Sequence, residues 1–161
     1  MDAIARSQKN GRARRSEAVI QRMKDINLKT GNESVLPDKV TYTSLIKALH
    51  EDRIPGCSEK GKALLKMMEE AATKGNSRLK PDLFTYSTVL NALSYDGYPE
   101  QCEELVDKME SEGLGGNIEI FPDIVCYNKV MASYRKQRRR DAAKVRYDCA
   151  QEAYNSCQSF Q

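Results

Sequence analysis

The chain has 161 residues, of which 30% are charged, and its formal net charge at pH 7 is +3. It contains no apolar run near the roughly 20 residues that a membrane-spanning helix needs, so we expect no membrane partner. The cysteines are five in number and never form C-x-x-C, which argues against a disulfide framework and a zinc site. We expect them to be buried thiols in a reducing compartment.

The most informative feature of the chain is an internal repeat. A Pro-Asp pair occurs three times, and the steps between the pairs are 44 and 41 residues. Each pair is preceded by a Gly-Asn pair and followed by a tyrosine four residues after the aspartate. The pairs are Pro37-Asp38, Pro81-Asp82 and Pro122-Asp123. Landmarks that stay in step predict an array of stacked units, so the function is expected on a repeated surface.

The predicted elements, in chain order, are pairs of helices. Residues 12–29 carry apolar side chains at helical spacing and are predicted as the second helix of a unit that lacks most of its first helix. Residues 39–82 contain one helix after Pro-Asp, a turn at Pro55-Gly56 and a second helix that ends before Gly75. Residues 83–123 repeat this scheme.

The last unit is predicted over residues 124–161, and its second helix, from about Asp141 to Tyr154, is more degenerate and richer in charge, as in a cap. The predicted domains are thus a partial first repeat at 1–38, repeats at 39–82 and 83–123, and the last repeat at 124–161. The predicted fold class is all-α, a right-handed α-solenoid of antiparallel helix pairs, whose first helices line a concave face.

The segments VTYTSLIKAL (residues 40–49), FTYSTVLNAL (84–93) and VCYNKVM (125–131) resemble the first helix of the pentatricopeptide repeat (PPR) family. The tripeptide Lys80-Pro81-Asp82 resembles the end of that repeat. The resemblance extends from about residue 10 to about residue 140. Family repeats are typically about 35 residues long, whereas these units are longer, with the extra residues in the turn and ahead of Pro-Asp.

The resemblance implies binding of single-stranded RNA, with one base per repeat. In the family, the residue after the first-helix tyrosine and the residue that closes the repeat contact the base. This implies that Thr43 acts with Asp82, and Ser87 with Asp123, while Asp38 and Asn128 contact the two outer bases. An ionised carboxylate accepts hydrogen bonds only, so it suits guanine or uracil, which offer a ring N–H.

The same resemblance assigns further roles. Val40, Phe84 and Val125 would sandwich the bases, and Lys136 would contact phosphate. The resemblance also implies a location in a mitochondrion or a plastid. It implies a role in RNA processing, stability, editing or translation, with other RNA-processing proteins as further partners. Residues 1–15 are basic with few acids but show no clear transit-peptide pattern.

Alternative interpretations accompany these roles. The three aspartates of the Pro-Asp pairs could be helix N-caps, and the repeated tyrosines, Tyr42, Tyr86 and Tyr127, are predicted to pack in the core. A protein-binding scaffold within a larger complex is the rival function, although the Trp-Leu-Gly-Tyr pattern of tetratricopeptide repeats is absent from a chain without tryptophan.

No catalytic activity is predicted. His50 is the only histidine, expected exposed at a helix end, and no catalytic set or Gly-rich phosphate loop surrounds it. We therefore expect no cofactor, no metal and no small-molecule substrate.

Overall fold

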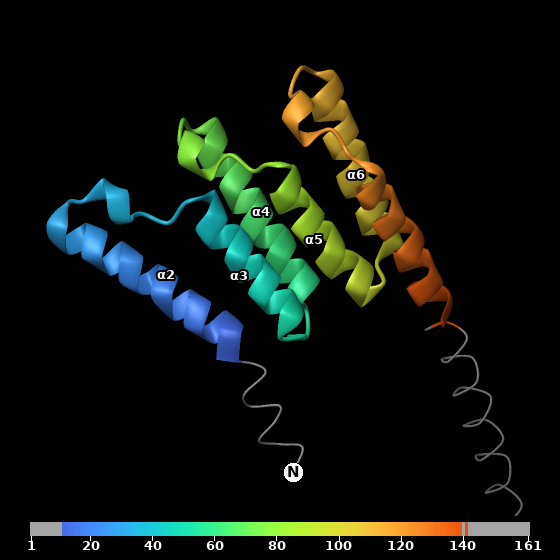
Figure 1. Ribbon diagram of the computed structural model, residues 1–161, viewed down its shortest axis with the longest axis horizontal. Helices are drawn as coiled ribbons and strands as arrows, with labels where there is room; N and C mark the ends of the chain where they lie inside the picture. Colours follow the sequence, from blue (N-terminus) through green and yellow to red (C-terminus); the bar gives the residue numbers. More distant parts are fainter. Residues whose placement is uncertain (1–10, 140, 142–161) are drawn as a thin grey trace, which may run out of the picture.

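The computed structural model describes residues 11–139 and 141, which form α-helices and short 3-10 turns with no strand among them. The helices stand side by side in a row (Figure 1). They are α2 (Gly11–Thr30), α3 (Lys39–Glu51), α4 (Cys57–Thr73), α5 (Leu83–Asp96) and α6 (Pro99–Leu114), followed by a helix over residues 124–139. The predicted all-α class and the solenoid of antiparallel helix pairs are confirmed.

Each first helix begins at the aspartate of a Pro-Asp pair. The Asp38 carboxylate accepts the backbone N–H of Thr41 at 2.9 Å. The Asp38 N–H in turn donates to the Thr41 hydroxyl, which completes a capping box. Asp82 caps α5 and Asp123 caps the 124–139 helix through the same bond to the third following residue, at 3.0 Å in both cases. Caps of this kind stabilise a helix by about 0.5–2 kcal/mol.

Each second helix is followed by a glycine with positive φ and a 3-10 turn. The glycines are Gly31, Gly75 and Gly116, with φ of 67°, 97° and 111°. The turns are η1 (Glu33–Val35), η2 (Ser77–Leu79) and η3 (Ile118–Ile120). Leu79 and Ile120 are buried against the neighbouring helices. The residues that lengthen these units thus include an anchored connection rather than a loose loop.

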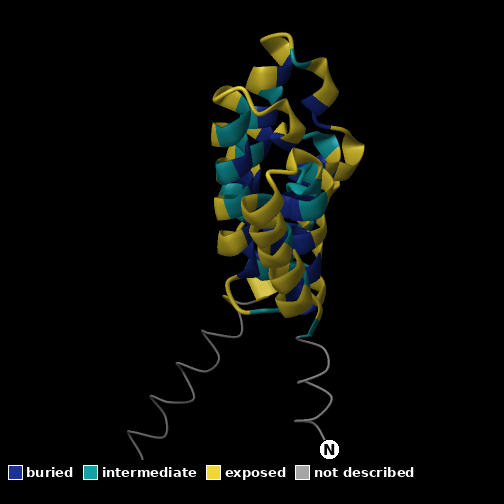
Figure 2. Ribbon diagram, turned by 90° about the vertical axis from the view of Figure 1, so that its left-hand side faces the viewer, coloured by how far each residue is buried: buried dark blue, intermediate teal, exposed yellow. Residues whose placement is uncertain are grey.

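The helices pack in two layers. The first helices α3 and α5 contact each other directly, and α4 packs against both of them. The second helices α4 and α6 are not among the pairs in extensive contact. Buried residues lie where the helices face one another, and exposed residues cover the outer surfaces (Figure 2). Leu49 and Met68 centre one apolar cluster, and Leu90, Leu93 and Met109 centre the next.

The predicted core packing of the repeated tyrosines holds for two of the three. Tyr42 and Tyr86 are buried, whereas Tyr127 remains 39% exposed. The difference arises because Tyr127 lies on the last described helix, where its hydroxyl donates to the Glu110 carboxylate at the edge of α6. Its ring has no further described unit to cover it.

Aspartates at the ends of the first helices cap the preceding second helices. Asp52 is buried and accepts the backbone N–H of Ala13 at 2.9 Å, near the beginning of the described part of α2. Asp96 accepts the N–H of Ser58 at 3.3 Å, in the first turn of α4, where Gly56 offers no side-chain cap. These bonds tie each unit to the one before it.

The remaining predictions on the fold are mixed in outcome. Cys57, Cys102 and Cys126 are buried free thiols, as expected, and burial raises the pKa of Cys57 and Cys102 to about 11. Cys149, Cys157, most of residues 1–15 and nearly all of the second helix expected at 141–154 lie outside the described residues. The unit boundaries remain predictions, although first helices begin at 39, 83 and 124.

Candidate nucleic-acid interface

A row of exposed apolar side chains marks the beginnings of the first helices. Val40, Phe84 and Val125 each occupy the second residue of their helix and are 61%, 64% and 47% exposed. Large apolar groups recurring on the surface at the same position in successive units indicate a binding surface, because no described residue buries them. These are the three residues predicted to sandwich bases.

The structure links Thr43 to Asp82 through Thr85. The Asp82 carboxylate accepts the Thr85 hydroxyl at 2.9 Å, and the Thr85 oxygen lies 2.9 Å from that of Thr43. Thr43 also donates to the carbonyl of Lys39 at 2.7 Å and is only 4% exposed. The predicted pair is therefore connected, but the Thr43 hydroxyl is covered.

The carboxylate of Asp82 is ionised and engaged at both oxygens. Burial raises its pKa, but hydrogen bonds from Lys39 and Thr85 outweigh burial, and the net shift is downward. The Lys39 ammonium lies 2.8 Å from the second oxygen of Asp82. A base that uses this oxygen as an acceptor has to share it with Lys39.

Ser87 and Asp123 form a more open arrangement. Asp123 is exposed, and the N–H of Cys126 holds its pKa below the usual value. Ser87 is half-buried, and Lys129 donates to its hydroxyl at 2.8 Å and to its carbonyl at 2.9 Å. Lys129 was not predicted as part of the site. The only indication in the sequence that Lys129 belongs to the site is that it follows the predicted contact residue Asn128.

The outer predicted residues flank these two pairs. Asn128 is exposed, and hydrogen bonds from Thr41 hold the pKa of Asp38 below its usual value. A hollow of about 330 Å³ brings Asp38, Val40 and Asp82 together with the basic side chain of Arg78. Three of the predicted contact residues thus share one depression between the beginnings of α3 and α5.

At the opposite ends of the first helices, cations gather around Tyr95. The Lys136 ammonium lies 3.8 Å from the centre of the Tyr95 ring, and the Arg53 guanidinium lies 5.7 Å from it. His50 meets the same ring edge-on at 5.1 Å. His50 was expected to be exposed, but it is half-buried, and burial lowers its pKa. The predicted phosphate contact, Lys136, is therefore held by a cation–π interaction.

Several findings bound the chemistry of the described part of the chain. None of its helices is both long and apolar enough to cross a membrane. Residues 11–139 contain no cluster of three or more histidine, cysteine or acidic side chains that could hold a metal ion.

The repeated helix pairs define a helical-repeat protein in which apolar side chains recur, exposed, along the first helices. The family model described as "PPR repeat" matches residues 84–114, which span nearly all of α5 and α6. The chain therefore carries a PPR repeat, and the predicted resemblance to that family is confirmed. A search of curated proteins finds no match to the chain. Proteins built from PPR repeats are in general RNA-binding helical-repeat proteins.

Proposed function

We propose that the chain binds single-stranded RNA in a sequence-specific manner along its first helices, with one base per repeat. The observation that carries the proposal is the regular exposure of Val40, Phe84 and Val125 at the second residue of each first helix. Such side chains offer apolar faces between which flat bases can insert. Stacking of a base on an aromatic side chain contributes about 1–3 kcal/mol.

The polar residues beside these apolar groups supply specificity in this proposal. Thr43 with Asp82, and Ser87 with Asp123, contact two successive bases and favour guanine, because an ionised carboxylate accepts the ring N–H. Asp38 and Asn128 contact the outer two bases, and Lys136 contacts phosphate. Because Thr43 is covered by Thr85, base contact at Thr43 requires α3 and α5 to separate locally.

Substitution of Phe84 tests the stacking surface. Phe84→Ala is expected to weaken binding of RNA oligonucleotides about 5- to 150-fold, the equivalent of the lost stacking energy. Leu114→Ala is the matched control, because Leu114 is also an exposed apolar residue of this unit but lies at the end of α6. Equal affinities of the two variants, measured by fluorescence anisotropy at low salt, would contradict the proposed surface.

Substitution of Asp82 tests base selection. Asp82→Asn replaces a pure acceptor with a group that can donate, so the preference at one nucleotide is expected to move from guanine toward adenine, whose ring nitrogen accepts. Lys39→Met is the control, because it removes the ion pair to Asp82 and keeps the carboxylate. If Asp82→Asn weakens binding to every oligonucleotide equally, Asp82 acts as a helix cap and not as a base contact.

The cellular role belongs to the same proposal. We place the protein in a mitochondrion or a plastid, acting in RNA processing, stability, editing or translation. Imaging of a fluorescent fusion to the complete reading frame tests this placement, and a purely cytosolic signal would reject it.

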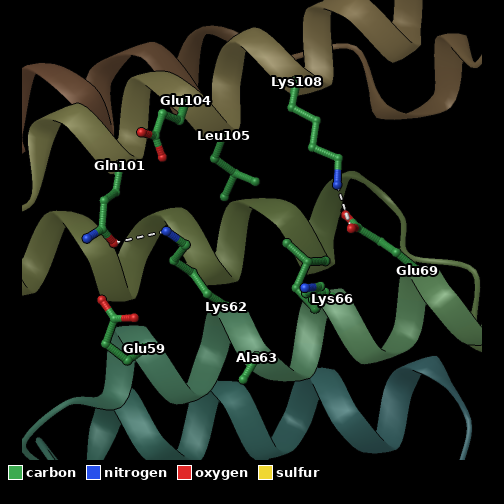
Figure 3. A pocket seen from close by; sticks show the side chains of 10 residues that line it. Glu59, Lys62, Ala63, Lys66, Glu69, Gln101, Glu104, Leu105 and Lys108 are labelled. Carbon is green, nitrogen blue, oxygen red and sulfur yellow. Dashed lines mark hydrogen bonds and ion pairs between the residues drawn. The ribbon is translucent and has the colours of Figure 1, made fainter.

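A protein-binding scaffold is the second candidate function, and a groove between α4 and α6 favours it. The groove has a volume of about 480 Å³, and Ala63 and Leu105 supply apolar surface between charged rims (Figure 3). Lys62 of α4 donates to Gln101 of α6 at 3.3 Å across it. This function predicts that Leu105→Arg abolishes co-purification with a protein partner, while the full chain binds no RNA oligonucleotide at low salt.

A further inference from the structure

Lys129 occupies an unusual place for a lysine. It follows Asn128 on the 124–139 helix, and its side chain is half-buried as it reaches back to α5. Its ammonium group donates to two oxygens, the carbonyl and the hydroxyl of Ser87, at 2.9 and 2.8 Å. Lysines are usually solvated and mobile, so two short bonds to a single residue fix this ammonium group beside a predicted base contact.

The preceding unit has no equivalent of this lysine. Thr88 takes the corresponding position on α5, and its hydroxyl donates to the carbonyl of Phe84 within its own helix. At the Thr43/Asp82 site, Thr85 of α5 covers the Thr43 hydroxyl instead. The two predicted base sites therefore differ in chemistry, although the sequence suggests that they are alike.

The charges around Lys129 favour a donor and an acceptor facing one base. The Asp123 carboxylate lies at the beginning of the same helix and attracts the ammonium group, while burial lowers the pKa of Lys129. Asp123 is exposed, and one of its carboxylate oxygens caps the helix by accepting the N–H of Cys126 at 3.0 Å. The site thus presents an ammonium donor held by Ser87 and an exposed carboxylate.

We propose that Lys129 is a third base-specifying side chain at the Ser87/Asp123 site, and that it selects a base with a keto group. The inference rests on the proposed RNA binding. An ammonium group has three protons, of which two are used by Ser87, so one remains for a base oxygen. Guanine and uracil carry such an oxygen next to a ring N–H, which Asp123 can accept. Adenine and cytosine present an exocyclic amine next to a ring acceptor, the reverse order.

The test is competition binding of the full chain with oligonucleotides that vary one nucleotide at a time. Lys129→Met keeps the length of the side chain and removes its donors. We expect the preference for guanine and uracil over adenine and cytosine to fall about fivefold or more at a single nucleotide, as for the loss of one charge-assisted hydrogen bond. Lys129→Arg is expected to retain the preference. Lys60→Met on α4 is the control for the lost charge, because Lys60 is exposed on a second helix.

The outcomes separate this inference from the proposed function. An equal loss for all oligonucleotides, with a weaker salt dependence, would make Lys129 a phosphate contact and overturn the inference. An unchanged ranking in Lys129→Met would overturn it as well and leave RNA binding intact. If the wild-type chain binds no oligonucleotide, the proposed function fails, and the inference fails with it.

Discussion

Removal of the Asp52 carboxylate should loosen α2 selectively. Asp52 ends α3, is 4% exposed and accepts the Ala13 N–H at 2.9 Å. Its neighbour Glu51 also links α3 to α2, through an ion pair with Arg12 at 2.9 Å, but there the two side chains are 70% and 37% exposed. Asp52 and Glu51 thus both join α3 to α2, and the two links differ mainly in how far they are buried.

The expected magnitudes follow from this difference in burial. A buried hydrogen bond to a charged group contributes about 1.5–3 kcal/mol, so Asp52→Ala should destabilise α2 by that amount. An exposed ion pair contributes about 0–1 kcal/mol, which sets the expectation for Glu51→Ala. Asp52→Asn should fall between them, because the amide oxygen can still accept the Ala13 N–H.

Hydrogen exchange measured by mass spectrometry checks this reasoning. Among the described elements, α2 packs extensively against α3 and η1 alone, so its amides should exchange about 10- to 150-fold faster in Asp52→Ala, while those of α5 change little. The reasoning is refuted if Asp52→Ala accelerates exchange in α2 no more than Glu51→Ala. It is also refuted if α5 and α2 accelerate equally.

Three further predictions concern the core, the phosphate contact and the helix caps. Leu93→Ala should lower the free energy of unfolding by about 2–5 kcal/mol, because Leu93 is fully buried, and a loss below about 1 kcal/mol in urea denaturation would contradict the assigned core. Lys136→Met should reduce the slope of log affinity for RNA against log salt by about 0.7, and an unchanged slope would exclude a phosphate contact. The pKa values of Asp38, Asp82 and Asp123 are lowered in the folded chain. The stability that these carboxylates contribute is therefore present above the ordinary aspartate pKa of 3.8 and is lost as the pH falls below it. Urea denaturation between about pH 2 and pH 6 measures this loss, and Asp38→Asn should flatten the profile relative to wild type.

The sequence alone determined where the first helices begin and which surface repeats. The capping bonds of Asp38, Asp82 and Asp123 join residues three apart, so local composition was enough to predict them. The resemblance to the PPR family implied that Val40 and Phe84 are accessible to a base, and both are exposed.

Only the tertiary structure decided how the polar residues of neighbouring units meet. The bond from Lys129 to Ser87 and the contact between Thr43 and Thr85 each join residues 42 apart in the sequence. Whether such side chains meet depends on how far each unit shifts and rotates against the next. The lengthened connections between units, which include the 3-10 turns, contribute to that shift, and no local pattern encodes it. The predicted pairs Thr43/Asp82 and Ser87/Asp123 look alike in sequence. In the structure, the Thr85 hydroxyl covers Thr43, whereas Lys129 binds Ser87.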